Sequence, residues 1–337
     1  MKELQRIRGS QWDVYTADRR RRWIPGRSSL KSERVDAYSS LWFLFVAFDL
    51  LCLILLGRGR YQGVLVLVEH YAPAGWLFAR LKGIPCAIVQ CGTYAIKLPH
   101  DLPFFHRVLE SADAVIPISN YTKKRMEGAG IRAKYSVVPL GVDTDLFHPV
   151  KGTEKRREIL FVGNLKSRKG IDFLIEATAL ANKRAPGIKL KIVGKIDKKS
   201  PAFAAVSKKI QDAGVDAEFC DSLSHDQLLH AYASARLNAL PSKSDGFYYE
   251  GFGLIHLEAG ACGTLTVGTM DSGNEDAVQA GFGRLVSYGD VEALATYILE
   301  AMAINPYPSL PVERLRTWID VARDYHGILT GLARPLN

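Results

Sequence analysis

Short apolar runs alternate with longer segments of mixed polarity along most of the chain. Each run is about four to six residues long and rich in Val, Ile and Leu, which is typical of a strand buried on both faces of a parallel sheet. The intervening segments space their apolar residues as helices do, and several end at glycine. This order predicts an α/β fold class with doubly wound parallel sheets.

The apolar runs predict the strands, and the segments between them predict the helices. The predicted strands are Val64–Glu69, Cys86–Gln90, Asp113–Ile118, Tyr135–Pro139, Ile159–Val162, Leu190–Val193 and Leu237–Leu240. The predicted helices are Ala74–Lys82 closed by Gly83, a Lys/Arg-rich helix capped by Ser119, Ile171–Lys183, Leu254–Ala261, a helix following the segment Gly281–Asp290, and the amphipathic Val312–Leu329. Pro117 cannot donate to a ladder, so its strand is predicted to lie at an edge or to end there.

The most apolar segment, Ser40–Leu56, does not predict a membrane span. Its apolar residues would make about 24 Å of helix, shorter than the ~30 Å hydrocarbon core. Asp49 in its middle would add roughly 3 kcal/mol in lipid. We expect a buried helix of the first domain. A helix lying in the membrane interface beside Arg19–Trp23 remains the alternative.

Length and composition restrict the classes of protein to which this chain can belong. The 337 residues suggest two domains, and an apolar fraction of 47% is enough for two cores. The five cysteines are scattered without a C-x-x-C pair, which argues against a disulfide framework or a zinc site. Met1–Ser10 is polar and charged, unlike a cleavable signal peptide. These features favour a cytoplasmic protein.

The positive charge lies almost entirely in the N-terminal half. Up to Val150 there are 21 Lys and Arg residues against 13 Asp and Glu residues, a net charge of +8, and the remainder carries 23 against 22. The densest run is Arg19–Trp23. A basic half can meet an anionic membrane surface or a phosphorylated acceptor. No nucleic-acid motif accompanies it, so we expect no nucleic-acid partner.

The stretch Leu237–Gly263 holds the strongest candidate chemistry. It predicts a strand, a polar loop, a glycine turn and a helix starting near Gly253. The free N–H groups and the dipole of a helix start favour a phosphate. Glu250 lies just before that start and Glu258 lies on the helix, so the two carboxylates could reach different parts of one phosphate-containing ligand. A solvated loop residue and a surface helix residue remain the alternative.

A second strand–loop–helix unit has the layout of a phosphate cradle. Gly163–Gly170 follows an apolar strand and precedes an amphipathic helix, although the spacing matches neither a P-loop nor a dinucleotide-binding motif. Arg168 and Lys169 stand at the helix start, where cations are unfavourable against the dipole. That placement indicates an anionic ligand, and two solvated cations remain the alternative.

Together these motifs resemble the family-four retaining glycosyltransferases, from about Gln11 to Leu329. The resemblance is carried by E-G-F-G-L-x-x-x-E at Glu250–Glu258, by the G-N-L-K-S-R-K-G loop at Gly163–Gly170 and by P-L-G-V-D-x-x-x-F-x-P before the second half. It implies the GT-B fold, two Rossmann-like domains facing across a cleft. The implied bounds are 1–148 for the acceptor domain, joined by a returning helix at 312–330, and 149–311 for the donor domain.

The resemblance also implies roles for single residues. Glu250 would hold sugar hydroxyls and oppose the positive reacting centre, and Glu258 would hold the ribose. Lys169 would bind the donor diphosphate. The amides of three residues would hold sugar or phosphate: Phe252, Gly253 and Leu254. No metal and no cofactor are implied beyond the nucleotide-diphosphate sugar, which is a co-substrate.

Two positions depart from the family pattern. Asn164, next to Gly163, stands where the family has an arginine for the diphosphate, and Arg168 is the residue that could replace the lost charge. Cys91-Gly92 stands where the family has His-Gly, whose histidine faces the sugar. Cys91, Gly92 and Tyr94 are therefore the predicted acceptor-side residues. His70 and His256 are not expected to replace the missing histidine, and His256 is interpreted as a packing residue.

The D-x-D sequence at Asp143 and Asp145 matches a metal-binding pattern of other glycosyltransferases. It lies in a predicted turn between Gly141 and Pro149, where aspartates commonly accept hydrogen bonds from backbone amides. The same segment resembles the interdomain connection of family four. We therefore expect a turn and no metal site.

The resemblance also bears on the start of the chain. Met1–Gly9 reads as the last turns of a helix, and Trp12–Thr16 reads as the second strand of the fold. We therefore expect this chain to lack the start of its first domain, namely the first strand and the glycine loop, and strand one is central in a doubly wound sheet. Either the natural product starts upstream, or the second strand moves to close the gap, or the first domain is poorly ordered. A variant fold that dispenses with this strand is the alternative.

The sequence therefore predicts a retaining glycosyltransferase of the hexosyltransferase type, acting in glycan, glycolipid or cell-envelope polysaccharide synthesis. Its partners would be a nucleotide-sugar donor, a sugar or lipid-linked acceptor and an anionic membrane surface, met at the inner face of the membrane. A catalytically weak nucleotide-sugar- or lipid-binding relative is the alternative, suggested by Asn164 and Cys91. A Rossmann oxidoreductase is excluded because no G-x-G-x-x-G follows a strand.

Overall fold

The structure, a computed structural model, describes residues 61–332. It divides into two compact units. Among the described residues, the first comprises 61–117, Lys123–Val138 and 319–332, and the second comprises Ile118–Thr122 and Pro139–Trp318. The predictions for the N-terminal strand and helix, the arginine run and the apolar segment Ser40–Leu56 lie outside the described residues.

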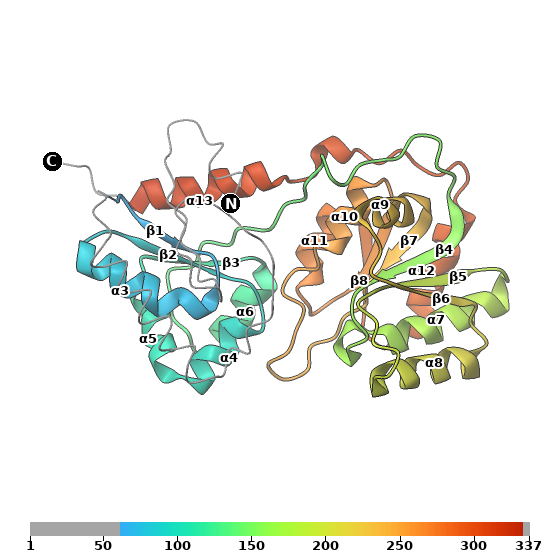
Figure 1. Cartoon of the computed structure of the whole chain (residues 1–337), viewed down its shortest axis with the longest axis horizontal. Helices are drawn as coiled ribbons and strands as arrows, with labels where there is room; N and C mark the ends of the chain where they lie inside the picture. Colours follow the sequence, from blue (N-terminus) through green and yellow to red (C-terminus); the bar gives the residue numbers. More distant parts are fainter. Residues whose placement is uncertain (1–60, 333–337) are drawn as a thin grey trace. The chain divides into compact units, whose positions relative to one another are not determined.

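The described part of the first unit contains a parallel sheet of order β1-β2-β3 (Figure 1). Its strands are β1 (Val64–Val66), β2 (Cys86–Gln90) and β3 (Ala114–Pro117). β2 is buried throughout and has the predicted bounds. β1 is shorter than predicted, because the chain turns into a 3-10 helix at Glu69–Tyr71.

The strand predicted at Tyr135–Pro139 is wrong, since only a bridge between Val115 and Tyr135 forms there. The Ser136 N–H still donates to Val115 and the Val138 N–H to Pro117, each at 3.0 Å. Pro117 has no N–H to return a hydrogen bond, so the ladder stops where β3 ends.

Helices cover both faces of this sheet. In Figure 1, α3 and α5 lie on one side of the strands and α13 lies on the other. The helices are α3 (Ala72–Lys82), α4 (Tyr94–Asp101), α5 (Pro103–Ser111), α6 (Asn120–Gly128) and α13 (Trp318–Leu332). Gly83 closes α3 in the left-handed conformation, with φ 66°. Ser119 accepts the Thr122 N–H at 2.9 Å, which confirms the predicted cap.

The last helix starts later than predicted, at Trp318 instead of Val312. Val142 forms a bridge with Thr317, and its N–H donates to the Arg316 carbonyl at 2.9 Å. This pairing keeps the backbone extended just before the helix, so Leu315 packs from outside it. Within α13 the buried residues are Val321, Ala322, Tyr325 and Leu329.

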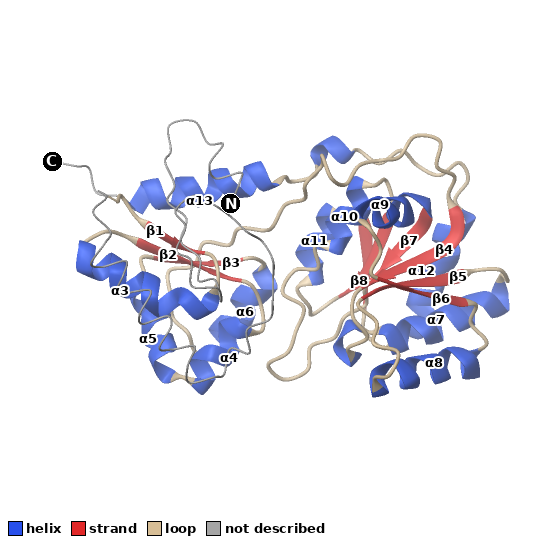
Figure 2. Ribbon diagram, viewed as in Figure 1, coloured by secondary structure: helices blue, strands red, loops and turns tan. Residues whose placement is uncertain are grey.

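The second unit holds a six-stranded parallel sheet of order β6-β5-β4-β7-β8-β9 (Figure 2). The order runs outward from β4 in both directions, so the winding reverses between β4 and β7, the topological switch point of a doubly wound sheet. The strands are β4 (Arg156–Val162), β5 (Lys189–Gly194), β6 (Ala217–Asp221), β7 (Ala235–Ala239), β8 (Leu265–Thr269) and β9 (Gly283–Val286).

Alternate residues of β4 enter different cores, as the uninterrupted apolar run requires. Ile159 and Phe161 pack in one cluster with α7 (Ile171–Arg184), α8 (Pro201–Ala213) and α12 (Val291–Ala303). Leu160 packs in a second cluster with α9 (His225–Ser234) and α10 (Ile255–Ala261). This unit also contains α11 (Asn274–Ala280).

Because β4 and β7 are adjacent and parallel, their carboxyl ends meet at the same edge of the sheet. The loop after β4 carries the predicted phosphate cradle, and the loop after β7 carries Glu250. The fold therefore brings the two candidate motifs to the switch point. Among residues 61–332, none of the helices is both long and apolar enough to cross a membrane.

Candidate donor-binding and catalytic site

The loop after β7 presents Glu250. β7 ends at Ala239, two residues before Pro241, and α10 begins at Ile255. Gly253 adopts φ 81°, and a Cβ there would lie 2.6 Å from Asn274 Oδ1, so only glycine fits this turn. The turn and the start of the helix lie close to the predicted positions.

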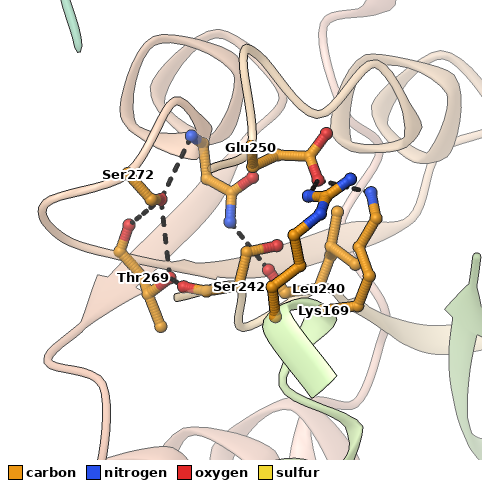
Figure 3. Close-up of polar contacts among 8 residues, drawn as sticks. Lys169, Leu240, Ser242, Glu250, Thr269 and Ser272 are labelled. Atoms are coloured by element: carbon orange, nitrogen blue, oxygen red, sulfur yellow. Dashed lines mark hydrogen bonds and ion pairs between the residues drawn. The ribbon is translucent and has the colours of Figure 1, made fainter. Parts of the chain in front are cut away.

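Glu250 pairs with both predicted cations (Figure 3). Its Oε2 accepts a hydrogen bond from Arg168 Nη1 at 3.0 Å and another from Lys169 Nζ. The side chain of Glu250 is 14% exposed, that of Arg168 is 22% exposed and that of Lys169 is 13% exposed. One carboxylate oxygen thus holds the two cations together at the edge of the sheet.

The surroundings of Glu250 keep its carboxylate charged. Burial alone would raise the pKa, but the charges and hydrogen bonds of Lys169 and Arg168 outweigh it and lower the pKa of Glu250 below its usual value. The site therefore presents two cations and one anion near neutral pH. A ligand with a diphosphate and a positively polarised carbon matches this charge pattern.

The two cations stand on a short 3-10 helix, Ser167–Lys169, within the predicted loop. Gly170 ends that turn at φ 72°, and a Cβ there would collide with the carbonyl of Pro241. The Lys243 N–H also donates to the carbonyl of Arg168 at 2.8 Å. These close backbone contacts hold the cation turn against the start of the Glu250 loop.

Asn164 lies in the turn that immediately follows β4. The Gly163 N–H donates to Val193 at 2.8 Å, and a Cβ on Gly194 would collide with the Gly163 carbonyl, so the ends of β4 and β5 approach closely. The Asn164 Oδ1 atom is buried and accepts no hydrogen bond from any residue between 61 and 332. The residue brings no charge to the site, whereas Arg168 reaches Glu250 directly.

Glu258 lies on α10 and accepts a hydrogen bond from the Tyr232 hydroxyl at 2.7 Å. Burial raises the pKa of Glu258, while the Tyr232 hydrogen bond opposes the rise. The contact of Tyr232 with Glu258 could not be predicted from the sequence, because an aromatic residue at helical spacing is typical of the hydrophobic core. The two glutamates of the motif thus occupy different electrostatic surroundings.

The predicted acceptor-side residues belong to the first unit. Cys91 and Tyr94 are exposed, and Gly92 between them is buried. Desolvation first and the Glu69 carboxylate second raise the pKa of the Cys91 thiol, so it is neutral. Glu69 accepts the Cys91 N–H at 2.5 Å and is itself buried. A glutamate directly after an apolar run was the signal that could have drawn attention to it.

Two further predictions concern residues left without a role in the site. Asp143 Oδ1 accepts the N–H groups of Asp145 at 3.1 Å and Leu146 at 3.2 Å, which confirms its turn-capping role. No group of three or more metal-ligating side chains occurs within residues 61–332. His256 is fully buried and bonds to Thr266 through Nδ1, which confirms the packing interpretation.

The chain matches two families of glycosyltransferases along most of its length. Residues 143–320 match the family described as glycosyl transferases group 1, and residues 2–146 match glycosyltransferase family 4. The first match covers more than half of the chain and contains Glu250, Arg168 and Lys169.

Two curated relatives indicate what similar proteins do. A GDP-mannose-dependent alpha-(1-6)-phosphatidylinositol monomannoside mannosyltransferase of Mycolicibacterium smegmatis is 31% identical over 222 residues, which are 61% of this chain and 57% of the relative. A D-inositol 3-phosphate glycosyltransferase of Segniliparus rotundus is 32% identical over 237 residues, 62% of this chain and 52% of the relative. The chain thus spans a little over half the length of these relatives.

Solved structures resemble the chain more fully. Anabaena Alr3699/HepE in complex with UDP has a TM-score of 0.70 at 18% identity, covering 88% of this chain and 85% of that one. The sucrose-phosphate synthase of Thermosynechococcus elongatus has a TM-score of 0.62 at 22% identity, covering 87% and 75%. These likenesses confirm the two-domain, Rossmann-like GT-B fold. The family match over residues 143–320, more than half of the chain, shows that the chain belongs to the glycosyl transferases group 1 family.

Proposed function

We propose that this protein is a retaining glycosyltransferase that moves a sugar from a nucleotide-diphosphate sugar to an acceptor hydroxyl. The observation that carries the proposal is the pairing of Glu250 with Arg168 and Lys169 at the switch point of the second unit. Ligands of doubly wound sheets bind at this edge. An anion between two cations matches a donor whose sugar carbon becomes positive as its diphosphate leaves.

The chemistry assigns a task to each charged group. The bond between the anomeric carbon and the diphosphate oxygen breaks, and the acceptor oxygen forms the new glycosidic bond on the same face. The departing phosphate oxygen takes the acceptor proton. Lys169 and Arg168 would neutralise the developing diphosphate charge, and Glu250 would oppose the positive carbon. Preorganised charges of this kind usually supply the largest share of rate enhancement.

The other candidate residues would bind the two substrates. Glu258 would hold the donor ribose, and the backbone amides of Phe252, Gly253 and Leu254 would hold sugar or phosphate. The acceptor would bind the first unit beside Cys91, Gly92 and Tyr94. Donor binding in the second unit requires no metal or further cofactor in this proposal.

The relatives' names suggest the first substrates to test. Both act on inositol-containing acceptors, and one uses GDP-mannose. A glycolipid acceptor built on phosphatidylinositol fits the first name, and an inositol phosphate fits the second. Thermal stabilisation of the purified protein by a panel of GDP-, UDP- and ADP-sugars would identify the donor. Transfer or donor hydrolysis above background would establish the activity.

A catalytically weak nucleotide-sugar-binding relative is the second candidate, favoured by the uncharged Asn164 and by Cys91. The two candidates differ in turnover and not in binding. The second candidate would be favoured if the donor stabilises the protein thermally without transfer or hydrolysis, and if Glu250→Gln leaves that stabilisation unchanged.

The basic N-terminal half is proposed to bring the protein reversibly to an anionic membrane from the cytoplasmic side. Each Lys or Arg near such a surface contributes about 1 kcal/mol, and salt screens it. Co-sedimentation with phosphatidylserine vesicles at low salt tests this. Failure to co-sediment at low salt would refute it.

A further inference from the structure

A cluster of buried polar groups lies beneath the Glu250 loop, in the turn from β8 to α11 (Figure 3). Its members are Thr269, Ser272, Gly273 and Asn274, here called the clamp. The three side chains are fully buried, although none is charged or assigned to the reaction. Buried polar groups are costly unless they are paired, so their partners show what the clamp does.

The clamp holds the start of the Glu250 loop. Asn274 Nδ2 donates to the carbonyl of Leu240 at 2.8 Å, directly after β7. The Thr269 hydroxyl donates to the carbonyl of Ser242. Ser272 joins these two contacts, because its hydroxyl donates to the Thr269 carbonyl at 2.8 Å and accepts the Asn274 N–H at 3.2 Å.

The same clamp holds the end of the loop. The Gly273 N–H donates to the backbone carbonyl of Glu250 at 2.9 Å. A Cβ on Gly273 would overlap the backbone of Glu250 and Gly251, so the two segments are in direct contact. Asn274 Oδ1 lies against Gly253, where a Cβ would come within 2.6 Å.

The clamp thus contacts the loop near its start and near its end. The Asp271 carbonyl of the same turn also accepts a hydrogen bond from the Ser244 hydroxyl, in the middle of the loop, at 3.4 Å. The carboxylate of Glu250 extends from the held end towards Arg168 and Lys169. A general packing role would not require contacts at both ends of a single loop. Backbone displacement of about 1 Å at a reacting group can cost roughly 100-fold in rate.

We propose that Thr269, Ser272 and Asn274 are positioning residues that fix the backbone of the Glu250 loop for catalysis. The inference rests on the proposed function, because it assigns the loop's rigidity to the same reaction. Asn274 is the central member, since it contacts Leu240 at the start of the loop and Gly253 at its end. In this proposal the clamp residues act through the backbone of the loop.

The test compares clamp variants with matched controls on α7. Thr269→Val and Asn274→Ala remove the clamp contacts. Thr178→Val and Asn182→Ala are the controls, since Thr178 donates to Leu174 at 2.8 Å and Asn182 to Ile188 at 2.9 Å away from the loop. Thr269→Ser retains the hydroxyl and serves as the conservative rescue.

Amide hydrogen exchange of the peptide containing Gly251 and Gly253 is the first readout. The second is kcat and KM with GDP-mannose, or with the donor the panel identifies. We expect the clamp variants to exchange at least about 10-fold faster in this peptide and to lose roughly 10- to 100-fold in kcat, with a smaller change in KM. Control variants that lose as much Tm as the clamp variants should keep the wild-type exchange rate in this peptide and the wild-type kcat. Thr269→Ser should recover most of kcat.

Clamp variants whose exchange and kcat match those of the controls would overturn the inference while leaving the proposed function intact. Wild-type protein without transfer or hydrolysis would overturn the function and with it the catalytic role of the clamp. Faster exchange with unchanged kcat would show a structural contact only and would also overturn the inference.

Discussion

Each unit places a glutamate beyond the carboxyl end of one of its strands, and the pKa values of the two glutamates shift in opposite directions. Glu250 in the second unit pairs with Arg168 and Lys169, and its pKa is lowered. Glu69 in the first unit is desolvated and accepts backbone N–H groups, including that of Cys91, and its pKa is raised. Burial raises both pKa values, so the neighbouring cations account for the difference.

The two units therefore differ in the chemistry that each would offer to a ligand. The second unit offers fixed charges, which suit a charged nucleotide-sugar. The first unit offers a carboxyl group whose pKa is raised by burial, beside a thiol whose pKa is also raised by burial. Under the proposed function these groups would meet the hydroxyl groups of an acceptor. Four predictions test this contrast, from the largest expected effect to the smallest.

Neutralising Glu250 should abolish most turnover. Glu250→Gln keeps the side-chain shape but removes the charge opposing the positive centre, and we expect a loss of at least ~100-fold in kcat. Steady-state transfer from the identified donor measures it. Glu292→Gln is the control, because Glu292 also pairs with an arginine, Arg184, but on the surface. If a folded Glu250→Gln protein keeps kcat within threefold of wild type, the catalytic role assigned to Glu250 is wrong.

Removing Lys169 should weaken donor binding more than acceptor binding. A charge-assisted hydrogen bond is worth roughly 1.5–3 kcal/mol, so the donor Kd should rise about 10- to 150-fold in Lys169→Ala. Arg168→Ala should behave alike if Arg168 supplies the charge that Asn164 lacks. Calorimetric titration with the donor checks both. An Asn164→Arg variant with unchanged donor affinity would show that position 164 does not face the diphosphate.

The Glu250 ion pairs should stabilise the second unit only above acidic pH. The folded-state pKa lies below the unfolded value near 4.5, so this contribution is present above pH 4.5 and is lost as pH falls through the folded pKa. Glu250→Gln should therefore lower the free energy of unfolding at pH 7 by roughly 1–3 kcal/mol, which lowers Tm. At strongly acidic pH the Tm of the variant should converge with that of wild type. An equal Tm difference at both pH values would contradict this.

Glu69→Gln should change stability with pH in the opposite direction to Glu250→Gln, and the effect should be the smallest of the four. The folded-state pKa of Glu69 is raised, so its contribution to stability decreases as pH rises above 4.5 through the folded pKa. A glutamine still accepts the Cys91 N–H without a charge to desolvate. Its Tm should equal or exceed that of wild type at pH 8 and lose the advantage at pH 4. Destabilisation at pH 8 would show that Glu69 needs its charge.

Local patterns were sufficient for much of the fold and for part of the site. β2 has its predicted bounds because an apolar run buried on both faces leaves little choice of boundary. Gly83 and Ser119 ended and began helices as their chemistry requires. The strand at Tyr135 and the start of α13 were predicted wrongly, because each depends on pairing with a segment distant in sequence. Glu250, Arg168 and Lys169 were recognisable because charged residues interrupt glycine-rich turns after strands.

The sequence by itself determined the alternation of strands and helices, the two units' class and the candidate charges, since side-chain periodicity and turn chemistry act within a few residues. Only the tertiary structure decided which of these residues meet. The parallel pairing of β4 with β7 brings the cation turn to Glu250, although more than 80 positions separate Lys169 from it. The pairing of β7 with β8 places Thr269 and Asn274 beneath the loop. Such ordinary polar residues carry no signal of their own, because their role follows from which strand ends are adjacent.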